Sequence, residues 1–148
     1  MDELDLRVRN HAYVSFVRDG IAPPPAGAAA ALGLTEAEAT AAYRRLHDAH
    51  ALVLEPDSVR IRMLNPFSAV ETPHRVESAG RSWYANCAWD ALGIPAALHA
   101  DGRIESLCPD CAEPLELEVA AGELVRGDEL LVHFVVPARH WWDDIGFT

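Results

Sequence analysis

A break at residues 64–68 constrains the fold most, because the pattern of apolar residues changes there. Before the break, most apolar residues recur at helical spacing, and after it most runs have the pattern of β-strands, with one helix among them. The break contains Asn65-Pro66, a dipeptide typical of turns and linkers. The 148 residues are enough for two small domains. We therefore predict an α+β fold with an N-terminal domain, residues 1–64, and a C-terminal domain, residues 65–148.

The N-terminal half has the pattern of three helices followed by a hairpin. The helices are predicted at residues 2–19, at residues 26–32 and from Thr35 to about residue 50, where Thr35 and Glu38 form a capping box. Two β-rich runs within residues 52–63 flank a turn. This order is typical of a winged helix, in which the helix from Thr35 would be the recognition helix.

The charge of the chain argues against a winged-helix transcription regulator. The formal net charge is −11, and all twelve basic residues are arginines. Residues 1–64 carry seven arginines against nine acids, and Glu36 and Glu38 would face the phosphates of bound DNA. We therefore expect no nucleic-acid partner. The predicted winged helix would have a structural or dimerising role, which makes a homodimer one expectation.

The sequence also predicts a cytoplasmic protein. No apolar run approaches the ~18 residues of a membrane span, so we expect no membrane association. The first residues lack the basic start and apolar core of a signal peptide. The three cysteines are an odd number and do not indicate a disulfide framework. In a reducing compartment they would be free thiols or metal ligands.

The C-terminal half alternates between predicted strands and one helix. Two strands are expected in residues 74–84, then a helix that stops near Gly93-Ile94-Pro95. Further strands are predicted at residues 103–107, 115–119 and 129–136. The last run is continuously apolar, which favours a strand buried on both faces. Together these elements predict a mixed, mainly antiparallel sheet with helices.

The central helix carries one thiol and one carboxyl in an apolar stretch. Cys87 and Asp90 are spaced i, i+3, which places both on one face of a helix. We expect this face to open into a pocket walled by Trp83, Trp89 or the tryptophans near the C-terminus. A carboxyl in such surroundings has a raised pKa and can hold a proton ready for delivery. The alternative is that Cys87 is a small buried hydrophobe and Asp90 a surface or capping residue.

A second pair of thiols has the spacing of half a zinc site. Cys108 and Cys111 enclose Pro-Asp, but no second pair of cysteines or histidines follows at a matching interval. The pair could bind a metal, form a redox-active dithiol or simply mark a turn between two strands. We predict that Cys108 is at least partly buried and that no stoichiometric zinc is bound. The candidates to complete a metal site in space are histidines: His99, His133 and His140.

Four segments together resemble the alkylmercury lyases, or organomercurial lyases. They are Asn-Pro-Phe-Ser at residues 65–68, Trp-Tyr-Ala-Asn-Cys-Ala-Trp-Asp-Ala-Leu at 83–92, Glu-Ser-Leu-Cys at 105–108 and Val-His-Phe at 132–134. The order of a winged-helix-like part and a mixed α+β catalytic part is also similar, so the resemblance covers essentially the whole chain. Its specific part is Cys87 with Asp90 and the residues around them.

The resemblance implies protonolytic cleavage of a carbon–mercury bond in a small organomercurial substrate, an activity of mercury resistance. Cys87 would be the catalytic thiolate that binds mercury, and Asp90 would donate or relay the proton to carbon. This role fits the residues, because thiolates bind soft metals strongly. Cys108 would have a structural role. The product is a hydrocarbon plus bound Hg(II), which small thiols or a partner protein would remove, and no organic cofactor is implied.

The chain departs from the family pattern at a second active-site cysteine. In the family that cysteine lies in a C-terminal segment, but no cysteine follows Cys111 here. Three explanations are open: the sequence ends before that segment, the protein is a C-terminally shortened member of the family, or a recoded residue such as selenocysteine stands at the position of the missing cysteine. With one thiol missing, we expect protonolysis to be slow or absent while Cys87 still binds mercurials. The alternative function is a thiol-based heavy-metal-binding or sensing protein on the same scaffold.

Overall fold

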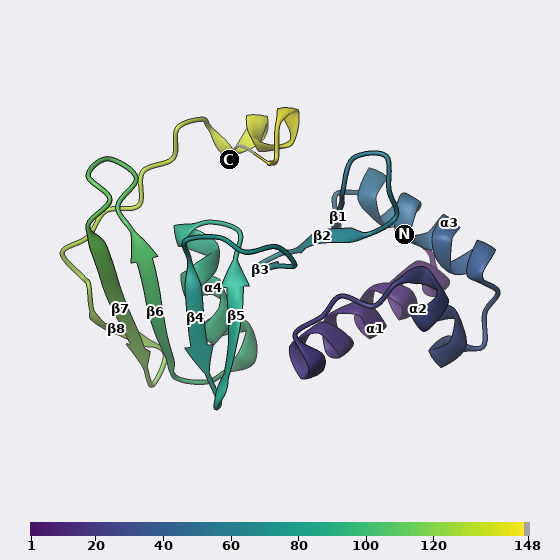
Figure 1. Ribbon diagram of the computed structural model, residues 1–148, viewed down its shortest axis with the longest axis horizontal. Helices are drawn as coiled ribbons and strands as arrows, with labels where there is room; N and C mark the ends of the chain where they lie inside the picture. The colour runs from purple at the N-terminus through teal and green to yellow at the C-terminus, as the bar shows by residue number, and fades with distance from the viewer. Residues whose placement is uncertain (147–148) are drawn as a thin grey trace. The chain divides into compact units, whose positions relative to one another are not determined.

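The computed structural model describes residues 1–146, which form two compact units divided between Glu71 and Thr72 (Figure 1). The first unit contains α1 (Glu3–Asp19), α2 (Pro25–Leu32), α3 (Glu36–Asp48), β1 (Val53–Leu54), β2 (Ile61–Leu64) and β3 (Phe67–Ser68). The second contains β4 (Arg75–Ser78), β5 (Arg81–Ala85), α4 (Ala88–Leu98), β6 (Gly102–Leu107), β7 (Pro114–Ala120), β8 (Glu123–Arg126) and the short 3₁₀ helix η1 (Ala138–Asp143). These elements confirm the predicted α+β class. The division into domains 1–64 and 65–148 stays a prediction.

Side-chain caps fix the starts of the two long helices in the first unit. Asp2 caps α1 by accepting a hydrogen bond from the Asp5 N–H at 2.8 Å, and Asp5 accepts one in return from the Asp2 N–H. Thr35 and Glu38 form the predicted capping box at α3. Such caps satisfy N–H groups that lack a partner within the helix. Within the described residues, no helix is both long and apolar enough to cross a bilayer.

The core of the first unit is built from small and aromatic side chains. Ala12, Ala39 and Ala42 are fully buried, so the helices can approach closely. Tyr43 is fully buried too, and its hydroxyl donates to the Pro23 carbonyl oxygen at 2.9 Å. A buried phenol with a satisfied hydroxyl adds apolar area without leaving an unpaired donor.

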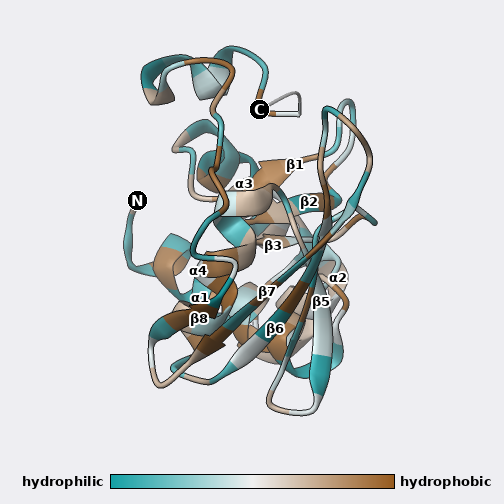
Figure 2. Ribbon diagram, turned by 90° about the vertical axis from the view of Figure 1, so that its left-hand side faces the viewer, coloured by the Kyte–Doolittle hydropathy of each residue, from teal (hydrophilic) through white to brown (hydrophobic). Residues whose placement is uncertain are grey.

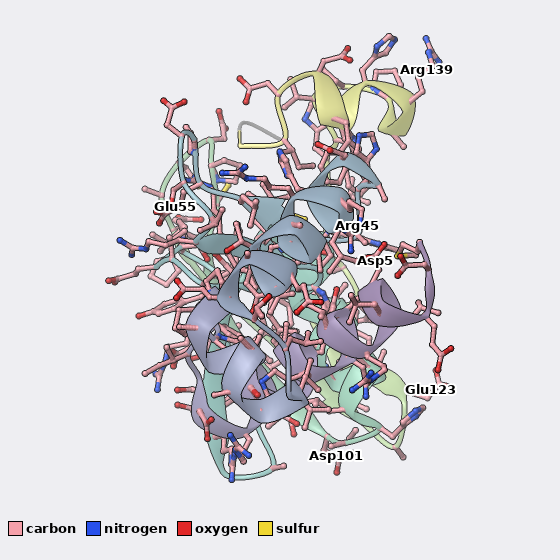
Figure 3. All side chains as sticks on the ribbon, turned by 90° about the vertical axis from the view of Figure 1, so that its right-hand side faces the viewer. Asp5, Arg45, Glu55, Asp101, Glu123 and Arg139 are labelled. Carbon is pink, nitrogen blue, oxygen red and sulfur yellow. The ribbon has the colours of Figure 1, made fainter. Side chains whose placement is uncertain are left out.

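One ion pair joins α1 to α3 at the edge of this core. Arg45 Nη2 lies 2.6 Å from Asp5 Oδ1, and the Asp5 side chain is only 4% exposed. Figure 3 shows the two side chains pointing toward one another from their helices. The Arg45 guanidinium holds the pKa of the Asp5 carboxyl below its ordinary value, against an opposing effect of burial. The pair therefore keeps a buried carboxyl charged.

A small antiparallel sheet completes the first unit. β1 pairs with β2 as the predicted hairpin, and β2 pairs with β3. Phe67 in β3 is buried against Phe16 of α1, with ring centroids 5.7 Å apart. The helix, short helix, helix and hairpin therefore follow in the predicted order.

The second unit is built on a larger antiparallel sheet. Its strands lie in the order β5-β4-β6-β7-β8. Every neighbouring pair is antiparallel, and β4 and β5 turn at Ala79 and Gly80 as predicted. β6 and β7 confirm the strands expected from alternating residues. β8 was not predicted from the sequence.

Helix α4 packs on the part of this sheet formed by β4, β5 and β6 (Figure 1). Ile94 of the helix is fully buried, as is Val76 of β4. Gly102 lets the helix approach β6, because a Cβ there would lie 2.5 Å from the Cγ of Pro95. The prediction that the helix stops near residues 93–95 is wrong, since it continues through Pro95 to Leu98. Pro95 is buried at this close approach, although proline inside a helix usually costs stability.

The predicted strand at residues 129–136 is absent, and the prediction that both its faces are buried is wrong. The run has no regular structure, and Leu131 is 94% exposed and Val135 70% exposed. Figure 2 shows this apolar segment as the brown trace that leads to η1. In the described residues the sheet ends at β8, and the run forms no strand beside it.

Candidate functional site

Cys87 lies at the junction between a strand and a helix. β5 ends at Ala85 and α4 begins at Ala88, so Cys87 is the N-cap residue, with extended backbone angles. The prediction that Cys87 sits within the helix is therefore wrong by one position. Its sulfur accepts a hydrogen bond from the backbone N–H of Asp90 at 3.4 Å. A polar side chain in an N-cap role satisfies a free N–H of the first turn, and here a thiol does so.

The capping geometry keeps Cys87 and Asp90 side by side. Asp90 is the third residue of α4, so its side chain lies over the first turn and beside the N-cap sulfur. Both residues are half-buried. The closeness expected from the i, i+3 spacing is therefore present, although its cause is a helix cap and not a shared helix face.

Asn86 is a site residue that the sequence analysis missed. Its Nδ2 donates to Asp90 Oδ2 at 3.1 Å, so the carboxyl is held from both sides. The i, i+4 spacing of Asn86 and Asp90 is a recognised stabilising interval, and it was the available signal. It carries little weight in a sequence because polar pairs at this interval are common on helix surfaces.

Burial shifts both acidic groups toward their protonated forms. It raises the pKa of the Asp90 carboxyl above its ordinary value, against the opposing hydrogen bonds from Asn86 and Cys87. Burial also raises the pKa of the Cys87 thiol, and the Asp90 carboxylate adds to this rise. The Asp90 N–H works in the other direction because it stabilises a thiolate. The site thus holds a thiol and a carboxyl that can exchange one proton.

Aromatic side chains connect the first turn of α4 to the C-terminal part of the chain. The ring centroids of Trp89 and Phe134 lie 6.1 Å apart, and those of Phe134 and Trp141 lie 5.2 Å apart. Trp141 also donates its indole N–H to the Val136 carbonyl oxygen at 3.0 Å. Trp83 is buried in β5. The C-terminal aromatic residues therefore pack two positions away from Cys87.

The pocket predicted at Cys87 stays a prediction. A cavity of about 450 Å³ lies at the opposite end of α4, where its lining includes Pro95, His99 and Leu124. The 11 residues of α4 make the helix about 16 Å long, so this cavity is remote from the Cys87 thiol. Its lining holds no thiol, and it does not form part of the candidate site.

Cys108 and Cys111 flank the turn that joins β6 to β7. Cys108 is half-buried directly after β6, which confirms its predicted partial burial, and Cys111 is exposed. His99 lies at the end of α4, while His133 and His140 lie in the C-terminal part of the chain; all three are exposed. Within residues 1–146, no three His, Cys, Asp or Glu side chains come together in a way that could hold a metal ion.

A family model described as alkylmercury lyase matches residues 67–148 of the chain. The chain is 35% identical over 69 residues to an alkylmercury lyase of Pseudomonas putida, which is 45% of this chain and 32% of that protein. It is 38% identical over 56 residues to one of Bacillus cereus, which is 38% of this chain and 26% of that protein. The matched stretches thus span a third or less of these curated relatives.

The fold is also similar to a solved structure, the crystal structure of the mercury-bound form of MerB2. The TM-score is 0.70 at 25% sequence identity, and the likeness covers 85% of this chain and 60% of that chain. The similarity therefore includes most of the helices and strands described above.

Proposed function

Because the chain belongs to the alkylmercury lyase family, we propose that it binds organomercury compounds through Cys87 and breaks their carbon–mercury bond with a proton carried by Asp90. One observation carries this proposal: the Cys87 sulfur caps α4 directly beside the carboxyl of Asp90. A soft metal ligand and a proton carrier thus lie together at the first turn of α4, which is the pairing that this reaction needs.

The first step is ligand exchange at mercury. The Cys87 thiol gives its proton to the Asp90 carboxylate, and the resulting thiolate replaces the thiolate or halide that came with the substrate. The Asp90 N–H stabilises the thiolate as it forms. Thiolates are strong ligands for soft metals, so the Cys87–mercury bond is favourable even though burial raises the pKa of the free thiol.

The second step is protonolysis. The Asp90 carboxyl delivers its proton to the carbon bound to mercury, and the electron pair of the carbon–mercury bond becomes the new carbon–hydrogen bond. A hydrocarbon leaves and mercury stays on Cys87 as Hg(II), so no atom is oxidised or reduced. The raised pKa of Asp90 favours its protonated form, and the Asn86 side chain keeps the carboxyl oriented.

The proposed reaction needs an acceptor for its product. Small thiols would remove Hg(II) from Cys87, as expected in the reducing cytoplasm, and the proposed reaction uses no organic cofactor. The structure of a mercury-bound relative supports Hg(II) as the species held at the end of the reaction. The N-terminal unit would then serve as a winged-helix-like structural or dimerising part, without a nucleic-acid partner.

The test is hydrocarbon release from an alkyl or aryl mercurial with excess small thiol, together with mass spectrometry of the protein adduct. Cys87→Ser should abolish both the adduct at this position and hydrocarbon release, because a hydroxyl is a poor ligand for a soft metal. Asp90→Asn should keep the adduct and lower the rate of release by about 10²- to 10⁴-fold, the usual contribution of a positioned general acid.

Asp128→Asn is the matched control, since Asp128 is an exposed acid of the same unit. It should release hydrocarbon at the parent rate. A Cys87→Ser protein that still cleaved the substrate at the parent rate would refute the role of Cys87. A parent protein that formed the adduct at Cys87 and released no hydrocarbon would refute the lyase step and leave mercury binding as the function.

A further inference from the structure

The loop between β6 and β7 holds two thiols in a compact turn. The Cys108 N–H donates to the Glu113 carbonyl oxygen, and the Ala112 N–H donates to the Cys108 carbonyl oxygen, both at 2.9 Å. Ala112 adopts a left-handed backbone conformation, with φ of 57°. These bonds close the loop directly after β6, so Cys108 and Cys111 are held at its two sides by the hairpin.

The groups of this loop also favour a thiolate at Cys108. Hydrogen bonding by the backbone N–H groups of Cys111 and Asp110 and by the Cys111 side chain lowers the pKa of the Cys108 thiol below its ordinary value, whereas burial and the Asp110 carboxylate oppose this. A thiol with a lowered pKa is more readily converted to the thiolate that binds a soft metal.

We propose that Cys108 and Cys111 form a second soft-metal site, in addition to Cys87, which takes inorganic Hg(II) between two thiolates. The exposed Cys111 gives the ion access, and the half-buried Cys108 anchors it to the sheet. The site concerns inorganic Hg(II) and does not depend on the lyase step. It goes beyond the proposed function, which assigns mercury only to Cys87.

The donor set decides the class of ion. Structural zinc sites use four ligands, whereas in residues 1–146 no third His, Cys, Asp or Glu joins this pair in a metal-binding group. Hg(II) is satisfied by two thiolates in a linear arrangement. Loading is a ligand exchange: two small thiolates leave Hg(II), each takes the proton of one protein thiol, and two mercury–sulfur bonds replace the two that break. Mercury remains Hg(II) throughout.

Two thiols in one loop should also outcompete free monothiols. Once the first sulfur has bound mercury, the second binds within the same molecule at an effective concentration on the order of millimolar or above. The pair should therefore retain Hg(II) in the presence of a small monothiol at concentrations that strip mercury from a single cysteine.

The experiment uses the full chain with Cys87→Ser, fully reduced and without oxygen, and the probe is HgCl₂ with excess small monothiol. Native mass spectrometry should find one mercury retained per chain. Adding Cys111→Ser should lower the retained mercury at least tenfold. Adding Glu113→Gln, which changes an exposed position of the same loop but keeps both thiols, should leave retention unchanged.

Two results would overturn the proposal. One is a Cys87→Ser protein that retains no mercury although both loop thiols are reduced. The other is equal retention after Cys111→Ser, or after Cys111→Ala as a second variant. Cys111 is exposed, so neither change should disturb folding, and circular dichroism checks this. Hydrocarbon release is not measured, so failure of this proposal is distinguishable from failure of the lyase.

Discussion

The backbone N–H of Asp90 points at the sulfur of Cys87 across 3.4 Å, while the carboxyl of the same residue lies beside that sulfur. The two groups of Asp90 act on the thiol in opposite directions. The N–H lowers the pKa of Cys87 because it stabilises a thiolate, and the carboxylate raises it because it repels one. The charge of Asp90 is therefore a direct control on the reactivity of Cys87.

Asp90→Asn should lower the pKa of the Cys87 thiol. The change removes the carboxylate charge but keeps the backbone N–H that caps the helix. Only the thiolate is alkylated, so the alkylation rate rises as pH passes through the pKa of the Cys87 thiol. The midpoint of Cys87 alkylation by iodoacetamide, followed by peptide mass spectrometry, should move to lower pH in the variant. An unchanged midpoint would show that the carboxylate does not act on the sulfur; Asp128→Asn is the control.

Asn86→Ala should raise the pKa of the Asp90 carboxyl further. The Asn86 side chain donates to that carboxyl at 3.1 Å and so favours its charged form, whereas burial favours the neutral form. Without the donor, the effect of burial is less opposed. The titration of the Asp90 carboxyl carbon by NMR should have its midpoint at higher pH in the variant. Asn10→Ala is the control, because it changes an exposed asparagine in the first unit and should leave the Asp90 midpoint in place. A shift of the midpoint to lower pH in Asn86→Ala would contradict the role of Asn86 as a donor that favours the charged carboxylate.

Ile94 and Leu131 should respond very differently to truncation. Ile94 is a fully buried residue of α4, the helix that packs on the sheet, so Ile94→Ala should lower the free energy of unfolding by about 2–5 kcal/mol. Leu131 is 94% exposed, so Leu131→Ala should change it by no more than about 0.5 kcal/mol. Urea unfolding followed by tryptophan fluorescence measures both. A comparably large loss in Leu131→Ala would mean that residues 129–136 are buried after all.

Local signals in the sequence predicted most of the elements. The Thr35 and Glu38 capping box fixed the start of α3, and Ala79-Gly80 marked the turn between β4 and β5. Both signals act within a few residues, so they do not depend on the rest of the fold. The alternating residues of β6 and β7 likewise report one buried and one exposed face.

The misses came from contacts that no local pattern contains. Pro95 normally ends a helix, but Gly102 on a distant strand leaves room for it inside α4. Residues 129–136 have the apolar pattern of a buried strand, yet they pair with no strand of the described sheet, which ends at β8. At the site, the spacing predicted that Cys87 and Asp90 meet. It did not predict that Cys87 is a cap, because that depends on where β5 ends.

Stability of the first unit toward acid should depend on the pair formed by Asp5 and Arg45. Arg45 lowers the pKa of the buried Asp5 carboxyl. The pair therefore stabilises the fold at pH values above the pKa of an aspartate in the unfolded chain, about 3.9. This contribution is lost as pH falls through the lower pKa that Asp5 has in the folded protein. Arg45→Gln should therefore destabilise α1 and α3 at pH 7. The gap between the parent and the variant in free energy of unfolding should narrow toward pH 2. Urea unfolding followed by circular dichroism at both pH values measures the gap. Arg44→Gln, at the exposed neighbouring position, should show a small gap with little pH dependence. If the gap for Arg45→Gln were equally large at pH 7 and pH 2, the ion pair would not be its cause.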